Sequence, residues 1–269
     1  MFHFVVTVDV DPPIPQSYGS LFIEYGVENF LKLFDEHLIK ATFFVPAVVA
    51  EKFPTTIKKV VKKGHEVACH GLKHDKREAT LGVSKQLQII KTATEIIQSV
   101  TGSRPFGFRA PLFNVNRNCW AALQKNDYAY DSSIVCSPFY GKYKNPFSMK
   151  PFPLLFSKED KNHSLLEVPV SVNPFLPFPL GGAYFRIFGT RWCKLGMKIN
   201  FIHGNPVVFY IHPKDVIPRQ WGLSWWWYQK TSNCMKMFKK IIEYARLCGA
   251  KFVTAYEVAK LFEVDQKRR

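Results

Sequence analysis

The sequence has no hydrophobic run of the ~18 to 20 residues that a membrane-spanning helix needs. Its first residues, "MFHFVVTVDVD", have neither the basic region nor the cleavage site of an export signal. The six cysteines form no C-x-x-C pair and no regular framework, which is typical of reduced thiols rather than of disulfides. Together these absences predict a cytoplasmic protein that contacts a membrane, if at all, from the side.

Acidic residues are scarce: there are 21 Asp and Glu against 37 Lys and Arg, so the formal net charge is +16. Such a charge attracts nucleic acid, an anionic membrane surface or a phosphorylated substrate. The basic residues are scattered, and no zinc finger, RNA-binding motif or helix-turn-helix pattern accompanies them, which argues against nucleic acid. Two interpretations stay open, an anionic partner and a set of solvated helix faces.

The 269 residues, 47% of them hydrophobic, are enough to bury a large core. Strand-like and helix-like segments alternate, starting with the β-branched run "FHFVVTVDV" and an amphipathic stretch near "EYGVENFLKLFDEHLI". This alternation predicts a parallel sheet covered by helices, most simply an α/β barrel. Residues 137–180, dense in Pro, Phe and Tyr, predict a loop-rich insertion with a strand pair. We expect one catalytic domain over residues 1–269.

Two helix boundaries are also predicted. Pro54 should interrupt or restart a helix that lies within residues 48–62, because proline cannot continue the hydrogen-bond pattern of a helix interior. A long amphipathic helix over residues 82–101 should stop at Gly102, a typical helix-ending glycine.

Side chains that can bind a metal or transfer a proton follow the predicted strands. Barrels of this kind place their catalytic groups at the C-terminal ends of the strands. Five strand ends carry such groups, in the stretches "TVDVDPP", "HEVACHGLKH", "GFRAP", "YAYDSS" and "VVFYIHP": Asp9, Asp11, His70, His74, Arg109, Asp131 and His212. That pattern is hard to obtain by chance in a chain with only 8 histidines.

The spacing of the first four groups predicts a metal site. His70 and His74 are one helical turn apart, so on a helix or a tight helical turn both imidazoles point the same way. Asp9 and Asp11, two residues apart on a strand, point to one face. Asp11 and the two histidines give a divalent metal three protein ligands and leave positions open.

The remaining groups complete a constellation for amide hydrolysis. Asp9 would be the general base, Arg109 would hold it ionised, and His212 could protonate a leaving amine. Each residue alone has a simpler interpretation as a helix cap, a loop anchor, a surface histidine or a core histidine. It is the combination at successive strand ends that favours the metal site.

The motifs "TVDVD", "HEVACHGLKH", "FRAP", "YDSS" and "YIHP", in this order, resemble those of the NodB-homology polysaccharide deacetylases, carbohydrate esterase family four. The resemblance extends from about residue 7 to the C-terminus. It implies a distorted (β/α) barrel that removes N-acetyl groups from amino sugars with a His-His-Asp metal, usually zinc. It implies these roles: Asp9 as the base, Asp11, His70 and His74 as metal ligands, His212 as the acid, Arg109 as the partner of the base, and Asp131 as the support of the acid histidine.

Within the family, the chain looks like a subgroup with an Asp-x-Asp first motif and a "GGAYFR" segment, here Gly181 to Arg186. Leu112 stands where a tyrosine is usual, and a backbone N–H of that segment could serve the oxyanion instead. Gly71 stands where many members carry Ser or Thr. These departures leave every catalytic group in place and affect the expected substrate range.

The expected function is therefore a hydrolase that removes an N-acetyl group from an amino sugar in a glycan, a lipid-linked precursor or a nucleotide-linked precursor, with one divalent ion, expected to be zinc. The basic charge fits a phosphorylated or lipid-pyrophosphate sugar at an anionic membrane face. One alternative is a deformylase of a formylated lipid-linked amino sugar. Another is a non-catalytic glycan-binding or anion-binding module, which the complete set of catalytic groups disfavours.

Overall fold

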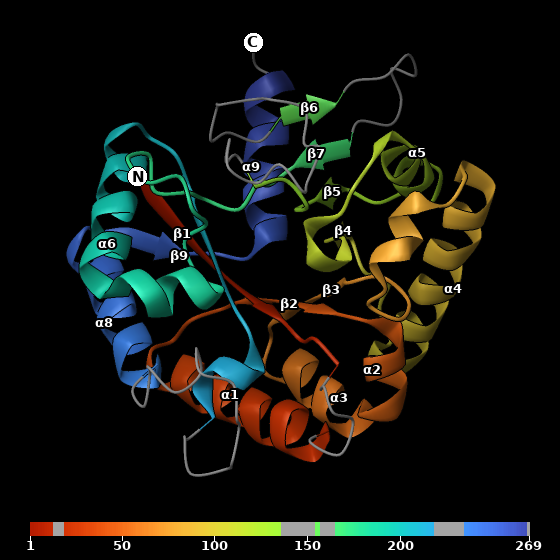
Figure 1. The fold of residues 1–269 in the computed structure, drawn as a ribbon, viewed down its shortest axis with the longest axis horizontal. Coiled ribbons are helices and arrows are strands. Elements are labelled where there is room, and N and C mark those ends of the chain that lie inside the picture. The colour runs from red at the N-terminus through yellow and green to blue at the C-terminus, as the bar shows by residue number, and fades with distance from the viewer. Residues whose placement is uncertain (13–18, 136–153, 157–164, 218–233, 268–269) are drawn as a thin grey trace.

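The computed structural model describes residues 1–12, 19–135, 154–156, 165–217 and 234–267. Within these ranges one sheet has the strand order β6-β7-β5-β4-β3-β2-β1-β8, and β9 pairs with β1 (Figure 1). Neighbouring strands are parallel except for the antiparallel pair β6–β7. The strands are β1 (Phe2–Asp9), β2 (Thr42–Val45), β3 (Glu66–Cys69), β4 (Gly107–Phe108), β5 (Tyr130–Asp131), β6 (Leu154–Phe156), β7 (Leu165–Glu167), β8 (Val207–Ile211) and β9 (Ala250–Phe252).

Helices surround this sheet on the outside (Figure 1). In that view α1, α2 and α3 lie below the strands, α4 and α5 to the right, and α6 and α8 to the left. The helices are α1 (Gly26–Glu36), α2 (Ala47–Lys52), α3 (Pro54–Lys62), α4 (Val83–Thr101), α5 (Arg117–Lys125), α6 (Gly182–Ile202), α8 (Cys234–Leu247) and α9 (Ala255–Lys267). Short helical turns are η2 (Ser20–Tyr25), η3 (Lys76–Thr80), η4 (Pro111–Phe113) and η5 (Pro213–Val216). The predicted α/β fold, with its curled parallel sheet, is confirmed.

The curled sheet continues from β7 to β8 through irregular backbone. Ser171 N donates a hydrogen bond to Val208 O (3.1 Å), and Tyr210 N donates one to Leu180 O (3.3 Å). Three prolines within residues 174–179 lack the N–H that a regular ladder requires. The barrel is therefore distorted on this side.

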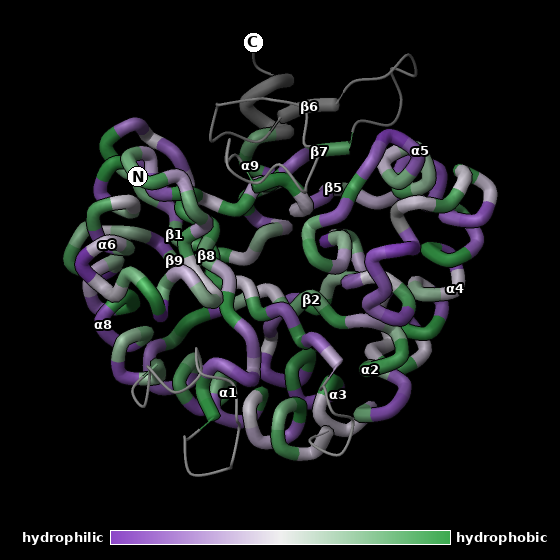
Figure 2. The backbone as a smooth tube through the Cα atoms, in the orientation of Figure 1, coloured by the Kyte–Doolittle hydropathy of each residue, from purple (hydrophilic) through white to green (hydrophobic). Residues whose placement is uncertain are grey.

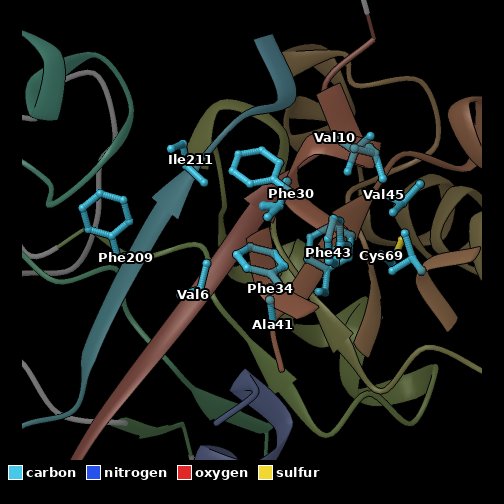
Figure 3. Close-up of a cluster of buried hydrophobic side chains, with 14 of the residues drawn as sticks. Val6, Val10, Phe30, Phe34, Ala41, Phe43, Val45, Cys69, Phe209 and Ile211 are labelled. Atoms are coloured by element: carbon cyan, nitrogen blue, oxygen red, sulfur yellow. The ribbon is translucent and has the colours of Figure 1, made fainter. Parts of the chain in front are cut away.

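The core explains why β1 carries hydrophobic side chains on both of its faces. Successive side chains of a strand face opposite ways, so Val6 joins the cluster under α1, whereas Val5 joins a second cluster with Phe44. Phe30 and Phe34, one turn apart on α1, stack with ring centroids 5.6 Å apart and pack against the strands (Figure 3). In Figure 2 the central strands are mainly hydrophobic, and the outer helices mix both characters along their length.

Several predicted boundaries are confirmed. Pro54 begins α3 directly after α2, and α4 ends at Gly102, whose φ of 77° is left-handed. The antiparallel β6–β7 pair lies within residues 137–180, where a strand pair was expected. Residues 137–153 and 157–164 of that predicted insertion lie outside the described residues, so the insertion itself stays a prediction. Strands from both halves of the chain share the sheet, and the single domain stays a prediction.

Two further findings bear on the environment of the protein. Among the described residues, no helix combines the length and the apolar character needed to cross a membrane. The five cysteines that the structure describes are free thiols, four of them buried.

Candidate metal centre

The C-terminal ends of four parallel strands meet at one edge of the sheet. Asp9 is the last residue of β1, His70 directly follows β3, Arg109 follows β4, and His212 follows β8. Parallel strands necessarily present these ends on the same side, which is why residues 203 positions apart in the chain, such as Asp11 and Lys214, come into contact.

Asp11, His70 and His74 form a compact group of metal-ligand atoms. Asp11 Oδ1 lies 3.1 Å from Nε2 of His74 and 3.5 Å from Nε2 of His70. One ligand atom from each residue lies within 4.8 Å of the others, a spacing that suits a shared divalent cation. The structure thus brings together the three residues that the sequence predicts as ligands.

The two histidines converge without a helix, so the predicted helical turn is wrong. Gly71 (φ 77°) and His74 (φ 60°) are both left-handed, and the chain between them is a bent loop. A Cβ at position 71 would lie 2.8 Å from Glu78 Oε2 and 2.9 Å from Pro111 Cγ, which explains the glycine. Glu78 accepts hydrogen bonds from the backbone N–H groups of Leu72 (3.1 Å) and Lys73 (2.8 Å) and so fixes the loop.

The tautomer of His70 is set by its neighbour. His70 Nδ1 lies 2.7 Å from the backbone carbonyl oxygen of Arg109, and a carbonyl can only accept. Nδ1 must therefore carry the proton, which leaves the lone pair of Nε2 directed at Asp11 and His74. An outer hydrogen bond of this kind is what orients metal-binding histidines in general.

Asp9 is buried in contact with a cation. Its Oδ1 accepts a hydrogen bond from Arg109 Nη1 (2.6 Å), and both side chains are almost fully buried. The guanidinium also donates to Thr7 Oγ1 (2.8 Å) and to both the backbone and the side chain of Ser132 (3.0 and 2.7 Å), and it lies over the Phe44 ring (4.0 Å to the centroid). This geometry fits the predicted pairing of Arg109 with an ionised Asp9.

His212 reaches the same place from β8. Its Nε2 lies 3.6 Å from Asp11 Oδ2, and its Nδ1 lies 3.0 Å from Asp215 Oδ2. Asp215 in turn forms a buried ion pair with Arg186 of α6. Burial, followed by the charge of Lys214, lowers the pKa of His212 well below its usual value.

The acid that contacts His212 is not the one predicted. Asp131 was expected to hold this histidine, but Asp215, three residues after it, does so. Asp131 instead accepts hydrogen bonds from Trp120 Nε1 (2.8 Å) and from the backbone of Ser132 (2.9 Å). Along the sheet through β1, four strands lie between β5, which holds Asp131, and β8. The Asp131 carboxylate also accepts a hydrogen bond from Ser133 Oγ, which in turn accepts one from the backbone N–H of Ala110, next to Arg109.

The two oxygens of Asp11 face different partners. Oδ1 faces the two histidines, and Oδ2 accepts a hydrogen bond from Lys214 Nζ (3.0 Å). Burial alone would raise the pKa of Asp11, but Lys214, His74 and His212 together hold it well below its usual value. Burial would likewise lower the pKa of His74, and Asp11 raises it instead. A carboxylate oxygen and two imidazoles at one place are a donor set that fits a divalent cation, which binds the imidazoles in their neutral form and displaces the proton that Asp11 favours on His74.

Behind Arg109 lies a buried pair of acids that the sequence analysis missed. Asp131 and Glu167 face each other across the β5–β7 ladder, and both are fully buried. Burial, followed by the charge of Asp131, raises the pKa of Glu167 well above its usual value, while Asp131 also accepts a hydrogen bond from Ser133 Oγ (2.5 Å). We therefore place the charge on Asp131 and the proton on Glu167.

This assignment makes a stability prediction. Glu167→Gln keeps the acceptor for Ile134 N and supplies an N–H for Asp131, so the free energy of unfolding should change by less than about 1 kcal/mol. Asp131→Asn removes the anion that accepts several hydrogen bonds and should cost about 2 to 4 kcal/mol. Denaturant unfolding of both variants measures the difference. Equal losses would show that Glu167 carries a charge.

Two models of known protein families match successive parts of this chain. Residues 4–130 match the family model described as polysaccharide deacetylase, and residues 132–259 match one described as a domain of unknown function (DUF3473). Residues 4–130 belong to the polysaccharide deacetylase family. The first match contains the three proposed metal ligands, together with Asp9 and Arg109, whereas His212 and Asp215 lie in the second.

Two curated relatives are similar over part of this chain. A peptidoglycan deacetylase-like protein of Gibberella zeae is 36% identical over 112 residues, which are 40% of this chain and 32% of the relative. The peptidoglycan deacetylase of Helicobacter pylori is 32% identical over 133 residues, 49% of this chain and 45% of the relative. The chain thus matches less than half the length of each.

Solved structures share the fold over nearly the whole chain. A protein of Mycobacterium smegmatis assigned as a polysaccharide deacetylase superposes with a TM-score of 0.72 at 20% identity, covering 98% of this chain and 91% of that one. An allantoinase superposes with a TM-score of 0.71 at 16% identity, covering 96% and 89%. At such identities the likeness concerns the fold alone.

Three residues near the metal centre were not predicted from the sequence as part of it: Arg186, Lys214 and Asp215. Asp215 had a detectable signal, because an acid three residues after a strand-ending histidine can close a capping box, as it does here. Arg186 stood in the "GGAYFR" segment, but nothing in the sequence linked it to "YIHP". Only the fold brings the two together.

Proposed function

We propose that this chain is a metal-dependent hydrolase that removes an N-acetyl group from an amino sugar. One observation carries the proposal: a buried carboxylate paired with arginine, a His-His-Asp group and a half-buried histidine converge at one edge of the sheet. Each has a separate task in amide hydrolysis, and their arrangement supports all three tasks at one place.

Asp11, His70 and His74 would hold the cation. A divalent ion there, expected to be zinc, would supply Lewis acidity for the amide carbonyl and for water. Asp9 then takes the proton of the attacking water at its carboxylate, and the buried Arg109 keeps that carboxylate ionised. The proton that Asp9 takes from water must reach the leaving amine nitrogen, and His212, oriented by Asp215, passes a proton to that nitrogen and is neutral again at the end of the reaction, as its lowered pKa favours. The role of an N–H near Leu112 toward the oxyanion stays a prediction.

The substrate class is also proposed. The family supports a carbohydrate, and the net charge of +16 supports an anionic form of it, such as a phosphorylated or lipid-linked sugar at a membrane face. We place the chain in the Asp-x-Asp subgroup from "TVDVD" and "GGAYFR". The free thiols of the described cysteines support a reducing, cytoplasmic setting for the reaction.

Acetate release tests the proposed function. Purified protein loaded with zinc should release acetate from N-acetylated amino sugars and leave a free amine, detected by mass spectrometry. The His70→Ala variant should release none above background, because it lacks a metal ligand. Formate release from N-formylated sugars at a higher rate would favour the deformylase. Glycan binding without any hydrolysis by the zinc-loaded protein would identify a binding module.

A further inference from the structure

A long stretch of the chain carries no acidic residue. Between Glu167 and Asp215 the sequence contains arginines and lysines but neither Asp nor Glu. This stretch includes α6, which lies with α8 at the outer edge of the molecule, on the side opposite α4 and α5 (Figure 1). An anionic partner would therefore meet no repulsive carboxylate from α6 itself.

The outward face of α6 alternates cations with aliphatic side chains. Beyond the bend at Gly189, the exposed residues are Arg191, Leu195, Lys198 and Ile202, spaced by four, three and four positions along one helical face. Leu195 is 44% exposed and Ile202 67% exposed. The opposite face packs into the core, so α6 needs no second partner for its own stability.

Two more apolar side chains are exposed before the bend at Gly189. Phe175 is 76% exposed, and Ile187 on the first half of the helix is 61% exposed. The ring of Phe178 stacks on Tyr184 (centroids 4.8 Å apart) and on Phe188 (5.4 Å), which fixes the turn beside the helix. These ring contacts join the segment before α6 to the first half of the helix, which carry Phe175 and Ile187 respectively.

We propose that this face is the surface by which the protein docks on an anionic lipid bilayer. We define the α6 surface as the exposed side chains after the bend, Arg191, Leu195, Lys198 and Ile202, together with the exposed Phe175 and Ile187 before it. Apolar side chains interleaved with long cations on one face are typical of helices that lie in a membrane interface, where Lys and Arg reach the headgroups and the apolar groups enter the acyl boundary. The absence of acids along α6 and the net charge of +16 complement an anionic headgroup layer.

The α6 surface is joined to the metal centre through one helix. Arg186 directly precedes Ile187 and forms the ion pair with Asp215, which holds His212. A protein docked through this surface would hold its acid histidine at a fixed place relative to the bilayer, as a lipid-linked substrate requires. This part of the inference rests on the proposed function, whereas docking itself does not.

Flotation with lipid vesicles tests the docking. The protein should float with mixed phosphatidylcholine and phosphatidylglycerol vesicles and not with phosphatidylcholine alone, and binding should weaken as salt rises. Arg191→Glu combined with Lys198→Glu should weaken binding by roughly thirty-fold or more, since two headgroup cations are lost and reversed. Phe175→Ser combined with Ile187→Ser should weaken it by about tenfold.

The matched control reverses two charges elsewhere. Lys58 and Lys62 are exposed on α3, one turn apart, and Lys58→Glu combined with Lys62→Glu changes the net charge by the same amount. This control should bind acidic vesicles within about threefold of the unchanged protein. Equal losses for the two charge-reversed variants would overturn the proposal, because only total charge would then matter.

Two other results would also overturn it. One is equal binding to neutral and acidic vesicles. The other is a dimer in solution that the α6 variants dissociate while vesicle binding is unchanged, which would make the face a contact between copies of the chain. Hydrolysis of a soluble N-acetylated sugar, measured on the same samples, should be the same in all variants. A failure of that activity would count against the proposed function and leave the vesicle result intact.

Discussion

Asp9→Asn should lower the rate of amide hydrolysis by about 10²- to 10⁴-fold while the protein keeps its metal. Asparagine retains the shape of the side chain and an oxygen for Arg109, but it cannot take a proton from water. Asp9 is not part of the group formed by Asp11, His70 and His74, so their ligand atoms remain in place. Acetate release and metal content, measured on one preparation, give the two values needed.

The same preparation should include Asp35→Asn as a control. Asp35 is an acid on α1 that pairs with Lys63, away from the metal centre, so its replacement should leave both rate and metal content unchanged. Arg109→Ala is a poorer probe, because it leaves the buried Asp9 without its cation and should cost about 3 to 5 kcal/mol of stability. Loss of metal in Asp9→Asn would show that Asp9 is a ligand.

Asp11→Asn should weaken metal binding, in contrast to Asp9→Asn, which should lower the rate and keep the metal. It removes the anionic oxygen that faces both histidines, so metal affinity should fall first and the rate with it. Replacing a group outside the ligand shell typically costs 10- to 100-fold in metal affinity, so the loss of a direct ligand should exceed about 100-fold. Excess zinc should restore part of the activity, because His70 and His74 and the base Asp9 are unchanged.

Titration of zinc into both variants measures this difference. Asp9→Asn should bind with the affinity of the unchanged protein, whereas Asp11→Asn should need far more zinc for half-saturation. The reverse result, with metal lost in Asp9→Asn and kept in Asp11→Asn, would exchange the roles of base and ligand.

The positions of the candidate catalytic groups could be predicted because they depend on a simple regularity. A parallel sheet places the C-terminal ends of its strands together, so Asp9, His70, Arg109 and His212 were expected to meet before any distance was known. The buried β1 and the helix stop at Gly102 followed from equally local rules, the β-branched run and the left-handed preference of glycine.

The predictions that were wrong concern features that depend on contacts between distant segments of the chain. The loop from Gly71 to His74 is shaped by Glu78 and Pro111, so spacing alone wrongly predicted a helical turn. Asp131 was assigned to His212 by resemblance, although the pairing in the structure is with Asp215.

Helix α6 was missed for a reason of composition. Glycines at its start, at its bend and in its second half, Gly182, Gly189 and Gly196, lower the helix propensity of the segment. Packing against the rest of the protein stabilises the helix despite this low propensity. A Cβ at position 196 would lie 3.2 Å from the backbone of Asn173, so glycine permits the helix to approach that segment closely. Tertiary contact overrides propensity in such a case.

The most direct test of the metal centre is anomalous diffraction at the zinc edge from crystals of the zinc-loaded protein. The geometry of Asp11, His70 and His74 predicts a single strong peak enclosed by Asp11 Oδ1 and by Nε2 of both histidines, with Asp9 outside the coordination shell. A peak bound by other residues, or no peak at this site in zinc-loaded crystals, would contradict the assignment.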